Sequence, residues 1–333
     1  MKKINVALIG VGYWGKNLLR NLVNCKNINL KAVCDQQYDK TKELVSQYGN
    51  IDIYTTIDDI LNLDIDGVVI ATPVDSHYEL TKKTLLAGKH VLIEKPITTN
   101  YEQAVEIDNL SKDKNLILMC DHTFCFSSPV RKIKKILAEK TLGDLICINS
   151  SRTNLGLFQK DTNVIWDLAP HDFSILDYVL TSEDDGAQFI NTRGVKYPNY
   201  DHCVDAQISL KMKSGLSINI HNSWIYPEKV RKMVFVGTEK MLVWDDLLNN
   251  NQKLKIYNKK VRVENNNFEY VDEGIKIPFV NNKEPLAELV NEFAKCVVEG
   301  SCEISDGTKA ANIVKMLELS NKSLENNKKM EVI

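Results

Sequence analysis

The chain has 333 residues, 44% of them hydrophobic, so it can bury a large core and divide into two domains, which excludes a single small binding module. Lys and Arg number 42 against 44 for Asp and Glu, a formal net charge of −2. Because the two signs are mixed along the chain, the composition gives no indication of electrostatic binding to nucleic acid or to anionic lipid, and we expect neither as a partner.

The N-terminal segment MKKINVALIG has only a short apolar run before its first glycine, too short for the hydrophobic region of a signal peptide. We therefore expect a cytoplasmic chain. Eight scattered cysteines without a C-x-x-C pair are expected to be reduced core residues. Neither the cluster around His122 nor the one around His202 offers four ligands at a zinc-like spacing, so we expect no metal.

Up to about residue 120, short apolar runs alternate with longer amphipathic stretches. The runs, typical of strands covered on both faces, are 4–9, 30–35, 67–72, 90–95 and 115–120. The amphipathic stretches, long enough for crossover helices, are 14–24, 38–48, 76–87 and 100–112. This alternation predicts an α/β domain over 1–120 built on a doubly wound parallel sheet.

From residue 121 the pattern changes to closely spaced β-like runs. After an amphipathic stretch at 129–140, the runs are 145–153, 204–212, 214–224, 232–238 and 240–246. Helices are expected at 164–180 and 284–298, and a polar surface hairpin at 249–272. We predict an α+β domain over 121–333 with an open, largely antiparallel sheet for substrate binding and oligomerisation. The sequence is also compatible with C-terminal helices that pack back on the first domain.

The stretch NVALIGVGYWGKNLL places Gly10, Gly12 and Gly15 as G-x-G-x-x-G between a buried-type strand and a helix. In that context the first glycine makes the turn, the second lets the backbone reach a pyrophosphate, and the third allows close helix packing. The helix N-terminus also favours an anion. We therefore predict a dinucleotide site, the alternative being a turn with only a structural role.

Asp35 ends the next apolar run, twenty residues after Gly15. A carboxylate there accepts hydrogen bonds from the ribose hydroxyls but repels a 2′-phosphate, and no arginine follows in CDQQYDK. The cofactor is therefore expected to be NAD and not NADP. The alternative is that Asp35 only caps a turn.

Two further segments, ATPVDSHYEL (71–80) and EKPITTN (94–100), follow predicted parallel strands, where open α/β sheets place their ligands. Lys95 in the second segment can donate a hydrogen bond to a substrate oxygen.

The motifs GVGYWG, ATPVDSH, EKP and WDLAPHD, in this order, resemble the glucose-fructose oxidoreductase / inositol dehydrogenase (Gfo/Idh/MocA) family over nearly the whole chain. The resemblance implies an NAD-dependent dehydrogenase acting on CH–OH groups. It maps the catalytic residues onto Lys95, Asp167 and His171, which converge on the nicotinamide in that family. It also implies a cis peptide between Lys95 and Pro96.

These residue types suit that chemistry. Asp167 and His171 are four apart, so on a helix they share one face, and Pro170 between them suits a helix's first turn. An imidazole can take the proton of a sugar hydroxyl, Lys95 can stabilise the developing alkoxide, and Asp167 can orient the imidazole or the sugar. The alternative for His171 is a hydrogen-bonded core histidine.

Other residues enter as weaker candidates. By the same resemblance, further cofactor contacts are Tyr13, Trp14, Thr72, Pro73, His77 and Glu94. Residues within reach of the substrate are His122, Arg152, Asn154, Asn163, Lys229 and Arg231. Packing of the aromatic pair, and a solvated face for the polar set, are the alternatives.

The stretches NLGLFQKDTNVIWDLAPHD and SWIYPEKVRKMVFVG look most like a branch from bacterial surface-polysaccharide pathways, whose members oxidise C3 of UDP-N-acetylglucosaminuronate. Diphosphate and carboxylate groups need cations, and Arg152, Lys229 and Arg231 supply them. The alternatives are a dehydrogenase of a free polyol or sugar, a ketosugar reductase, and an inactive nucleotide-sensing protein.

We further expect a homodimer or homotetramer formed mainly by residues 204–246, because the open sheet face retains outward Ile and Trp candidates. The alternative is a monomer whose sheet is covered by its own hairpin at 249–272.

Overall fold

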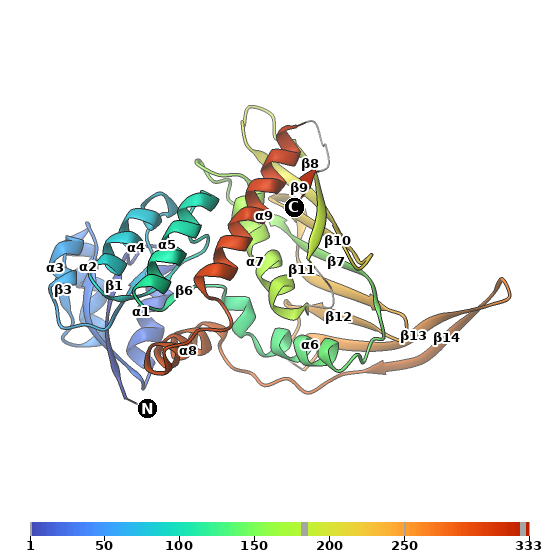
Figure 1. Ribbon diagram of the computed structural model, residues 1–333, viewed down its shortest axis with the longest axis horizontal. Coiled ribbons are helices and arrows are strands. Elements are labelled where there is room, and N and C mark those ends of the chain that lie inside the picture. The colour runs from blue at the N-terminus through green and yellow to red at the C-terminus, as the bar shows by residue number, and fades with distance from the viewer. Residues whose placement is uncertain (1, 181–185, 250, 327–330, 333) are drawn as a thin grey trace. The chain divides into compact units, whose positions relative to one another are not determined.

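The computed structural model describes residues 2–180, 186–249, 251–326 and 331–332. The chain divides into two compact units, one of Met1–Ser127 with Lys283–Lys315 and one of Ser128–Asn282 with Met316–Ile333. Both appear in Figure 1, where the colour follows the chain. None of the helices in the described part of the chain is long and apolar enough to cross a membrane.

The first unit contains a six-stranded, wholly parallel sheet with the order β3-β2-β1-β4-β5-β6. Its strands are β1 (Ile4–Ile9), β2 (Ile28–Cys34), β3 (Asp52–Tyr54), β4 (Gly67–Ile70), β5 (His90–Ile93) and β6 (Leu118–Cys120). The central strands are buried on both faces, which explains their continuous apolar runs. The predicted doubly wound parallel sheet is confirmed.

Helices pack around this sheet, and all except α8 (Pro285–Glu299), which comes from the later part of the chain, lie between its strands in sequence. They are α1 (Gly15–Asn24), α2 (Tyr38–Val45), α3 (Ile57–Leu61), α4 (His77–Leu86), α5 (Tyr101–Asp113) and α8 (Pro285–Glu299), with the short 3₁₀ turns η1 (Ser46–Tyr48), η2 (Val74–Ser76) and η3 (Thr123–Phe126). Strand β3 and helix α3 were not predicted. The strand is only three residues long at the sheet edge, so it carries no periodic signal.

The second unit contains a nine-stranded sheet with the order β14-β13-β12-β11-β7-β10-β9-β8-β15. Its strands are β7 (Leu145–Leu155), β8 (Ala187–Lys196), β9 (Cys203–Met212), β10 (Ser217–Ser223), β11 (Ile225–Gly237), β12 (Met241–Asp245), β13 (Leu254–Glu264), β14 (Asn267–Lys276) and β15 (Glu331–Val332). All neighbours run antiparallel except β7 and β10. The predicted largely antiparallel α+β unit is confirmed.

Helices α6 (Ser128–Ala138) and α7 (Val164–Val179) belong to this unit, and α9 (Gly307–Glu325) starts in the first unit and ends in the second. Helix α7 packs on β9 and β10. Alternate residues of β9 are buried, whereas Gln207, Ser209 and Lys211 between them are exposed. One sheet face is therefore apolar and the other, over this region, is polar.

The expectation of outward Ile and Trp side chains on this sheet is wrong. Ile208, Ile218, Ile220 and Trp224 are all buried. They alternate with the polar residues of β9 and β10, so the period of two places them on the apolar face. The half-exposed apolar residues of the other face are instead on β11 and β12, for example Val234 and Val243.

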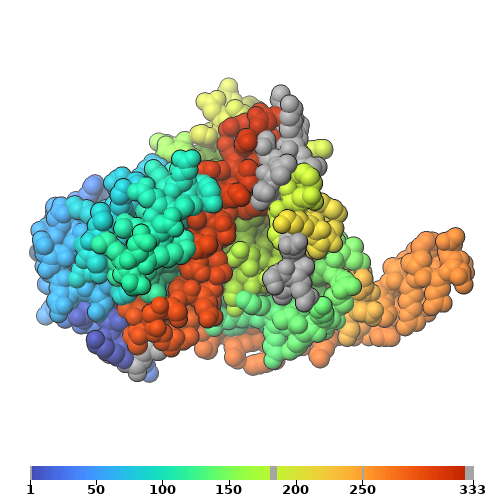
Figure 2. All heavy atoms as spheres, in the orientation of Figure 1, coloured from blue at the N-terminus to red at the C-terminus, as the bar shows by residue number. Residues whose placement is uncertain are grey.

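The polar hairpin predicted at 249–272 corresponds to β13 and β14. It pairs with β12 and continues the sheet at its edge, so it does not lie over a sheet face. Figure 2 shows its tip projecting from the rest of the second unit. Val263, Phe268 and Tyr270 are exposed there. The arrangement on which the monomer alternative relied is therefore not the one observed.

Candidate functional site

The glycine loop follows β1 at the carboxyl edge of the first sheet. Gly10 has φ +88°, and a Cβ there would lie 2.6 Å from the carbonyl oxygen of Ala71. A Cβ on Gly15 would overlap the Gly10 carbonyl oxygen, whereas one on Gly12 would meet nothing within 4 Å. Two glycines are thus required by packing, and Gly12 leaves free the space through which a ligand approaches the backbone.

The start of α1 suits an anion. Trp14, the residue that precedes the helix, makes no side-chain cap, and no acidic residue occupies the first turn. The helix therefore keeps its positive end uncompensated by side chains. Tyr13 is 94% exposed, and Trp14 donates from its indole Nε1 to Oδ2 of Asp121 at 3.4 Å. This geometry fits the pyrophosphate of a dinucleotide.

Asp35 follows β2, and its carboxylate hydrogen-bonds to the backbone of two segments, the glycine loop and the turn after β2. Its Oδ2 accepts a hydrogen bond from the Val11 N–H at 2.9 Å, and its Oδ1 accepts one from the Gln37 N–H at 2.9 Å. The carboxylate therefore caps a turn and also braces the glycine loop. Each carboxylate oxygen has a second lone pair, so these bonds leave acceptor capacity for ribose hydroxyls.

His77 is buried and ties two loops together. Its Nδ1 lies 2.9 Å from the carbonyl oxygen of Pro96, and its Nε2 lies 2.9 Å from that of Thr72. Burial lowers the pKa of His77, although both carbonyls oppose the shift. Both ring nitrogens of His77, a predicted cofactor contact, therefore lie within hydrogen-bond distance of protein carbonyl oxygens. Thr72 also accepts a 2.7 Å hydrogen bond from Ser76, and Pro73 precedes η2.

Lys95 and Glu94 follow β5. The peptide between Lys95 and Pro96 is cis, as predicted. Glu94 Oε2 accepts a hydrogen bond from the Lys95 backbone N–H at 3.2 Å. The parallel topology places both residues at the same sheet edge as the glycine loop, as expected for a ligand-binding edge.

His122 follows β6 and is buried. The Ser305 hydroxyl donates to the Cys120 carbonyl oxygen at 2.7 Å, and its oxygen lies 2.7 Å from Nδ1 of His122. Since the single hydroxyl proton is used by Cys120, Nδ1 carries the imidazole proton. Burial lowers the pKa of His122 to about 3, opposed by Asp306. The ring is therefore neutral at pH 7.

In the second unit, α7 carries the predicted pair Asp167 and His171 one turn apart. Asn163, predicted to reach substrate, instead caps this helix: its Oδ1 accepts from the backbone N–H groups of Ile165 and Trp166 at 3.0 and 3.2 Å. Pro170 lies inside the helix, so its placement in the first turn is wrong, because the helix begins earlier than Asp167.

Asp167 is oriented by a residue that the sequence did not reveal. The indole Nε1 of Trp224 donates to Oδ2 of Asp167 at 3.0 Å, and Trp224 is buried. The ring of Phe158 stacks on Trp224 with centroids 5.9 Å apart. Tyr197 and Tyr200 pack in turn on Phe158, at 5.7 and 4.9 Å. An aromatic cluster thus supports this acidic residue.

The predicted substrate cations differ in their surroundings. Arg152 is buried, and its Nε lies 3.6 Å from Oδ2 of Asp172. Asp172 also accepts from the Ser150 hydroxyl at Oδ1 and from the Asn222 amide at Oδ2. Arg231 lies opposite Arg152 in the β7–β11 register. Burial and then the Arg152 charge lower the pKa of Arg231, while Asp246 opposes the shift.

Two other predicted substrate residues lie on strands of this sheet. Lys229 is exposed on β11, and Asn154 is half-buried on β7. Because Arg152 is buried and lies beside Asp172, Arg231 and Lys229 are the remaining candidate anion ligands.

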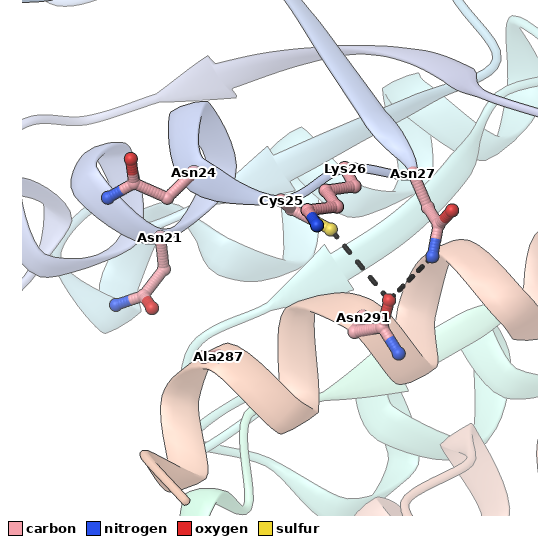
Figure 3. A pocket seen from close by; sticks show the side chains of 7 residues that line it. All are labelled: Asn21, Asn24, Cys25, Lys26, Asn27, Ala287 and Asn291. Atoms are coloured by element: carbon pink, nitrogen blue, oxygen red, sulfur yellow. Dashed lines mark hydrogen bonds between the residues drawn. The ribbon is translucent and has the colours of Figure 1, made fainter.

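A polar cavity of about 320 Å³ lies in the first unit between α1 and α8. Figure 3 shows the Asn291 side chain accepting from Asn27 at 2.7 Å and facing the thiol of Cys25 at 4.0 Å. Asparagine amides do not titrate, so Asn27 and Asn291 form no acid–base pair. Within the described residues, no three His, Cys, Asp or Glu side chains gather as a metal site.

Two family models match the chain. Residues 4–122 match the model described as an oxidoreductase family with an NAD-binding Rossmann fold, and residues 130–243 match the GFO/IDH/MocA C-terminal domain. The chain belongs to the Gfo/Idh/MocA family of oxidoreductases. Its first unit is accordingly an NAD-binding Rossmann domain.

Relatives within this Gfo/Idh/MocA family agree in part of their length. An uncharacterised oxidoreductase of Schizosaccharomyces pombe is 32% identical over 196 residues, covering 54% of this chain and 52% of that protein. The 2,7-anhydro-N-acetylneuraminate hydratase of Mediterraneibacter gnavus is 27% identical over 167 residues, covering 50% and 43%. The chain thus matches about half the length of these curated relatives.

Solved Gfo/Idh/MocA-like structures share the fold over the whole chain. A UDP-N-acetylglucosamine 3-dehydrogenase from Acidithiobacillus ferrooxidans has a TM-score of 0.81 at 21% identity, covering 99% of this chain and 100% of that one. A scyllo-inositol dehydrogenase from Lactobacillus casei, solved with NAD(H) and scyllo-inositol, has a TM-score of 0.82 at 17% identity, covering 99% of each chain. At these identities the likeness concerns the fold alone.

Proposed function

We propose that this chain oxidises a secondary hydroxyl of a sugar with NAD, and that its substrate is a nucleotide sugar of the UDP-N-acetylglucosaminuronate type, oxidised at C3 in surface-polysaccharide synthesis. The observation that carries the reaction is the pair Asp167 and His171 on one face of α7, with Asp167 held by Trp224. An oriented carboxylate beside an imidazole is the arrangement of a general base and its orienting group.

The chemistry is assigned to three side chains. His171 takes the hydroxyl proton of the substrate on its imidazole, and Asp167 orients the imidazole or the sugar. The Lys95 ammonium donates a hydrogen bond to the substrate oxygen as negative charge develops on it. NAD, when bound, supplies the acceptor for the hydride of the carbinol carbon.

Two facts support a nucleotide-sugar substrate. Arg231 and Lys229 remain as candidate partners for a diphosphate or a carboxylate, and a free polyol has no such group to bind. In addition, a protein that shares the whole fold is described as a UDP-N-acetylglucosamine 3-dehydrogenase. The sequence stretches that resemble the surface-polysaccharide branch point the same way.

NAD reduction with a panel of UDP-sugars, free polyols and free sugars tests this proposal, with His171→Asn as the control. We expect reduction with a UDP-sugar acid, and a rate lower by a factor of about 10² or more with the control. Activity confined to a free polyol would overturn the substrate class. NAD binding without turnover of any substrate would favour the nucleotide-sensing alternative.

A further inference from the structure

The neighbouring parallel strands β5 and β6 each end in an acidic residue. Glu94 follows Ile93, Asp121 follows Cys120, and Ile93 and Cys120 are register partners. The Asp121 N–H donates to the Ile93 carbonyl oxygen at 2.6 Å, which continues the pairing. Two carboxyl groups therefore lie next to one another at the sheet edge that carries Lys95.

The two carboxyl groups differ in their donors. Asp121 is 2% exposed; its Oδ2 accepts from the Trp14 indole at 3.4 Å, and its Oδ1 accepts from the Thr123 hydroxyl. Glu94 Oε2 accepts from the Lys95 N–H, but Glu94 Oε1 is fully enclosed and has no hydrogen-bond donor among the described residues. An ionised oxygen in that position would be costly, and a proton on it removes the cost.

We propose that Glu94 and Asp121 share one proton, with Glu94 as a neutral acid that donates to ionised Asp121, and that this singly charged pair keeps Lys95 in its ammonium form. Glu94 and Asp121 are thus positioning residues for Lys95. The role rests on the proposed function, in which the Lys95 ammonium stabilises the developing alkoxide.

The electrostatics agree with this assignment. Burial raises the pKa of Glu94 well above its usual range, and the charge of Asp121 and a hydrogen bond to it act in the same direction, while Lys95 opposes them. Two adjacent carboxyl groups that cannot both ionise are a known way to hold a proton at neutral pH. The shared proton also removes the like-charge repulsion within the pair.

The other titratable groups that interact with this edge are Cys120, Cys125 and His122, with Asp306 acting on His122. Burial raises the pKa of Cys120 well above its usual range and lowers that of His122 to about 3. Both are therefore neutral at pH 7. The charge balance there rests on the acid pair, with one negative charge, and on Lys95.

Infrared spectra of the full-length wild type and its variants, compared as wild type minus variant, test the shared proton without any substrate. The wild type is expected to show the band of a protonated carboxyl group at neutral pH, and Glu94→Gln to lack it. The matched control is Asp108→Asn, because Asp108 is buried but accepts from Lys112 at 2.7 Å and Thr308 at 2.9 Å and needs no proton. This control should retain the band, and a wild type without it would overturn the proposal.

The pH profile of kcat tests the link to Lys95. The double variant Glu94→Gln/Asp121→Asn removes the negative charge of the pair, which the proposal holds responsible for favouring the Lys95 ammonium, so the alkaline limb should move downward by about one pH unit. Glu94→Gln alone keeps the charge of Asp121, and Asp108→Asn lies outside the pair, so both should leave that limb near its wild-type position. An alkaline limb that does not move in the double variant would overturn the proposed role. A chain that shows the band but reduces no NAD with any sugar would instead overturn the proposed function.

Discussion

The indole of Trp224 donates a 3.0 Å hydrogen bond to the carboxylate of Asp167, and so joins the end of β10 to the first turns of α7. Trp224→Phe keeps the ring but removes this donor to a charged group. We expect kcat to fall about tenfold and stability to fall by about 1–2 kcal/mol, with the Kd for NAD unchanged. Steady-state kinetics and NAD titration measure this. Trp244→Phe, a buried indole on β12, is the matched control, and an equal loss of kcat there would contradict a specific role for Trp224.

Lys95 and His171 are expected to act in the chemical step and not in cofactor binding. Lys95→Met and His171→Asn should each lower kcat by roughly 10²–10⁴, the usual size for a lost oxyanion donor or general base, with NAD affinity near that of wild type. Steady-state rates and cofactor titration provide both readouts. Activity within a few-fold of wild type would show that the residue performs no chemistry.

Asp35 should make the chain prefer NAD to NADP. The 2′-phosphate would be desolvated against a carboxylate, a mismatch on the order of several kcal/mol before relaxation. Dissociation constants for the two cofactors measure the preference. Asp35→Asn keeps an oxygen acceptor toward the Val11 N–H and should narrow the gap between the two constants. Equal affinities in the wild type would contradict the assignment.

His122 should make stability fall in mild acid. The folded chain keeps the ring neutral, because burial lowers its pKa to about 3 from an ordinary value of 6.5. Below pH 6.5 His122 binds a proton in the unfolded chain but not in the folded chain. The free energy of unfolding is therefore unaffected by protonation of His122 above pH 6.5, and it declines by about 2 kcal/mol on going to pH 5. Urea unfolding at pH 5 and 7.5 should show a smaller pH difference for His122→Gln, and an unchanged difference would refute this.

The second unit is expected to associate with a second copy through residues of about 204–246. This prediction no longer rests on outward Ile and Trp side chains but on half-exposed Val234 and Val243. Light scattering at micromolar protein should give a dimer or tetramer. A particle of one chain's mass, 37.9 kDa, with or without NAD, would exclude it.

Local patterns were sufficient for much of the first unit. The spacing of Gly10, Gly12 and Gly15 and the buried runs predicted the parallel sheet, because both signals lie within a few residues. Edge strand β3 shows the limit, since a three-residue strand has no period. The helix at 164–180 was predicted, but Pro170 lies inside it and not in its first turn. Contacts between distant segments had no local signal at all.

Trp224 and Ser305 illustrate that limit within the candidate site. The partner of Trp224 is 57 residues away in sequence, and that of Ser305 is 183 residues away. Hydrophobic periodicity describes one element at a time, so neither pairing was predictable from one sequence. The ion pair of Arg152 with Asp172 was unpredictable for the same reason, because it joins a strand, β7, to a helix, α7.

The first unit is discontinuous, because it needs residues 283–315 as well as 1–127. Leu289, Val290 and Phe293 on α8 are buried, and the Phe293 ring lies against Gly67 of β4. During synthesis, the first 127 residues must therefore wait with this apolar surface uncovered until the whole second unit has been translated. A fragment ending at residue 127 is therefore expected to aggregate when expressed alone, because it lacks the α8 side chains that cover this surface.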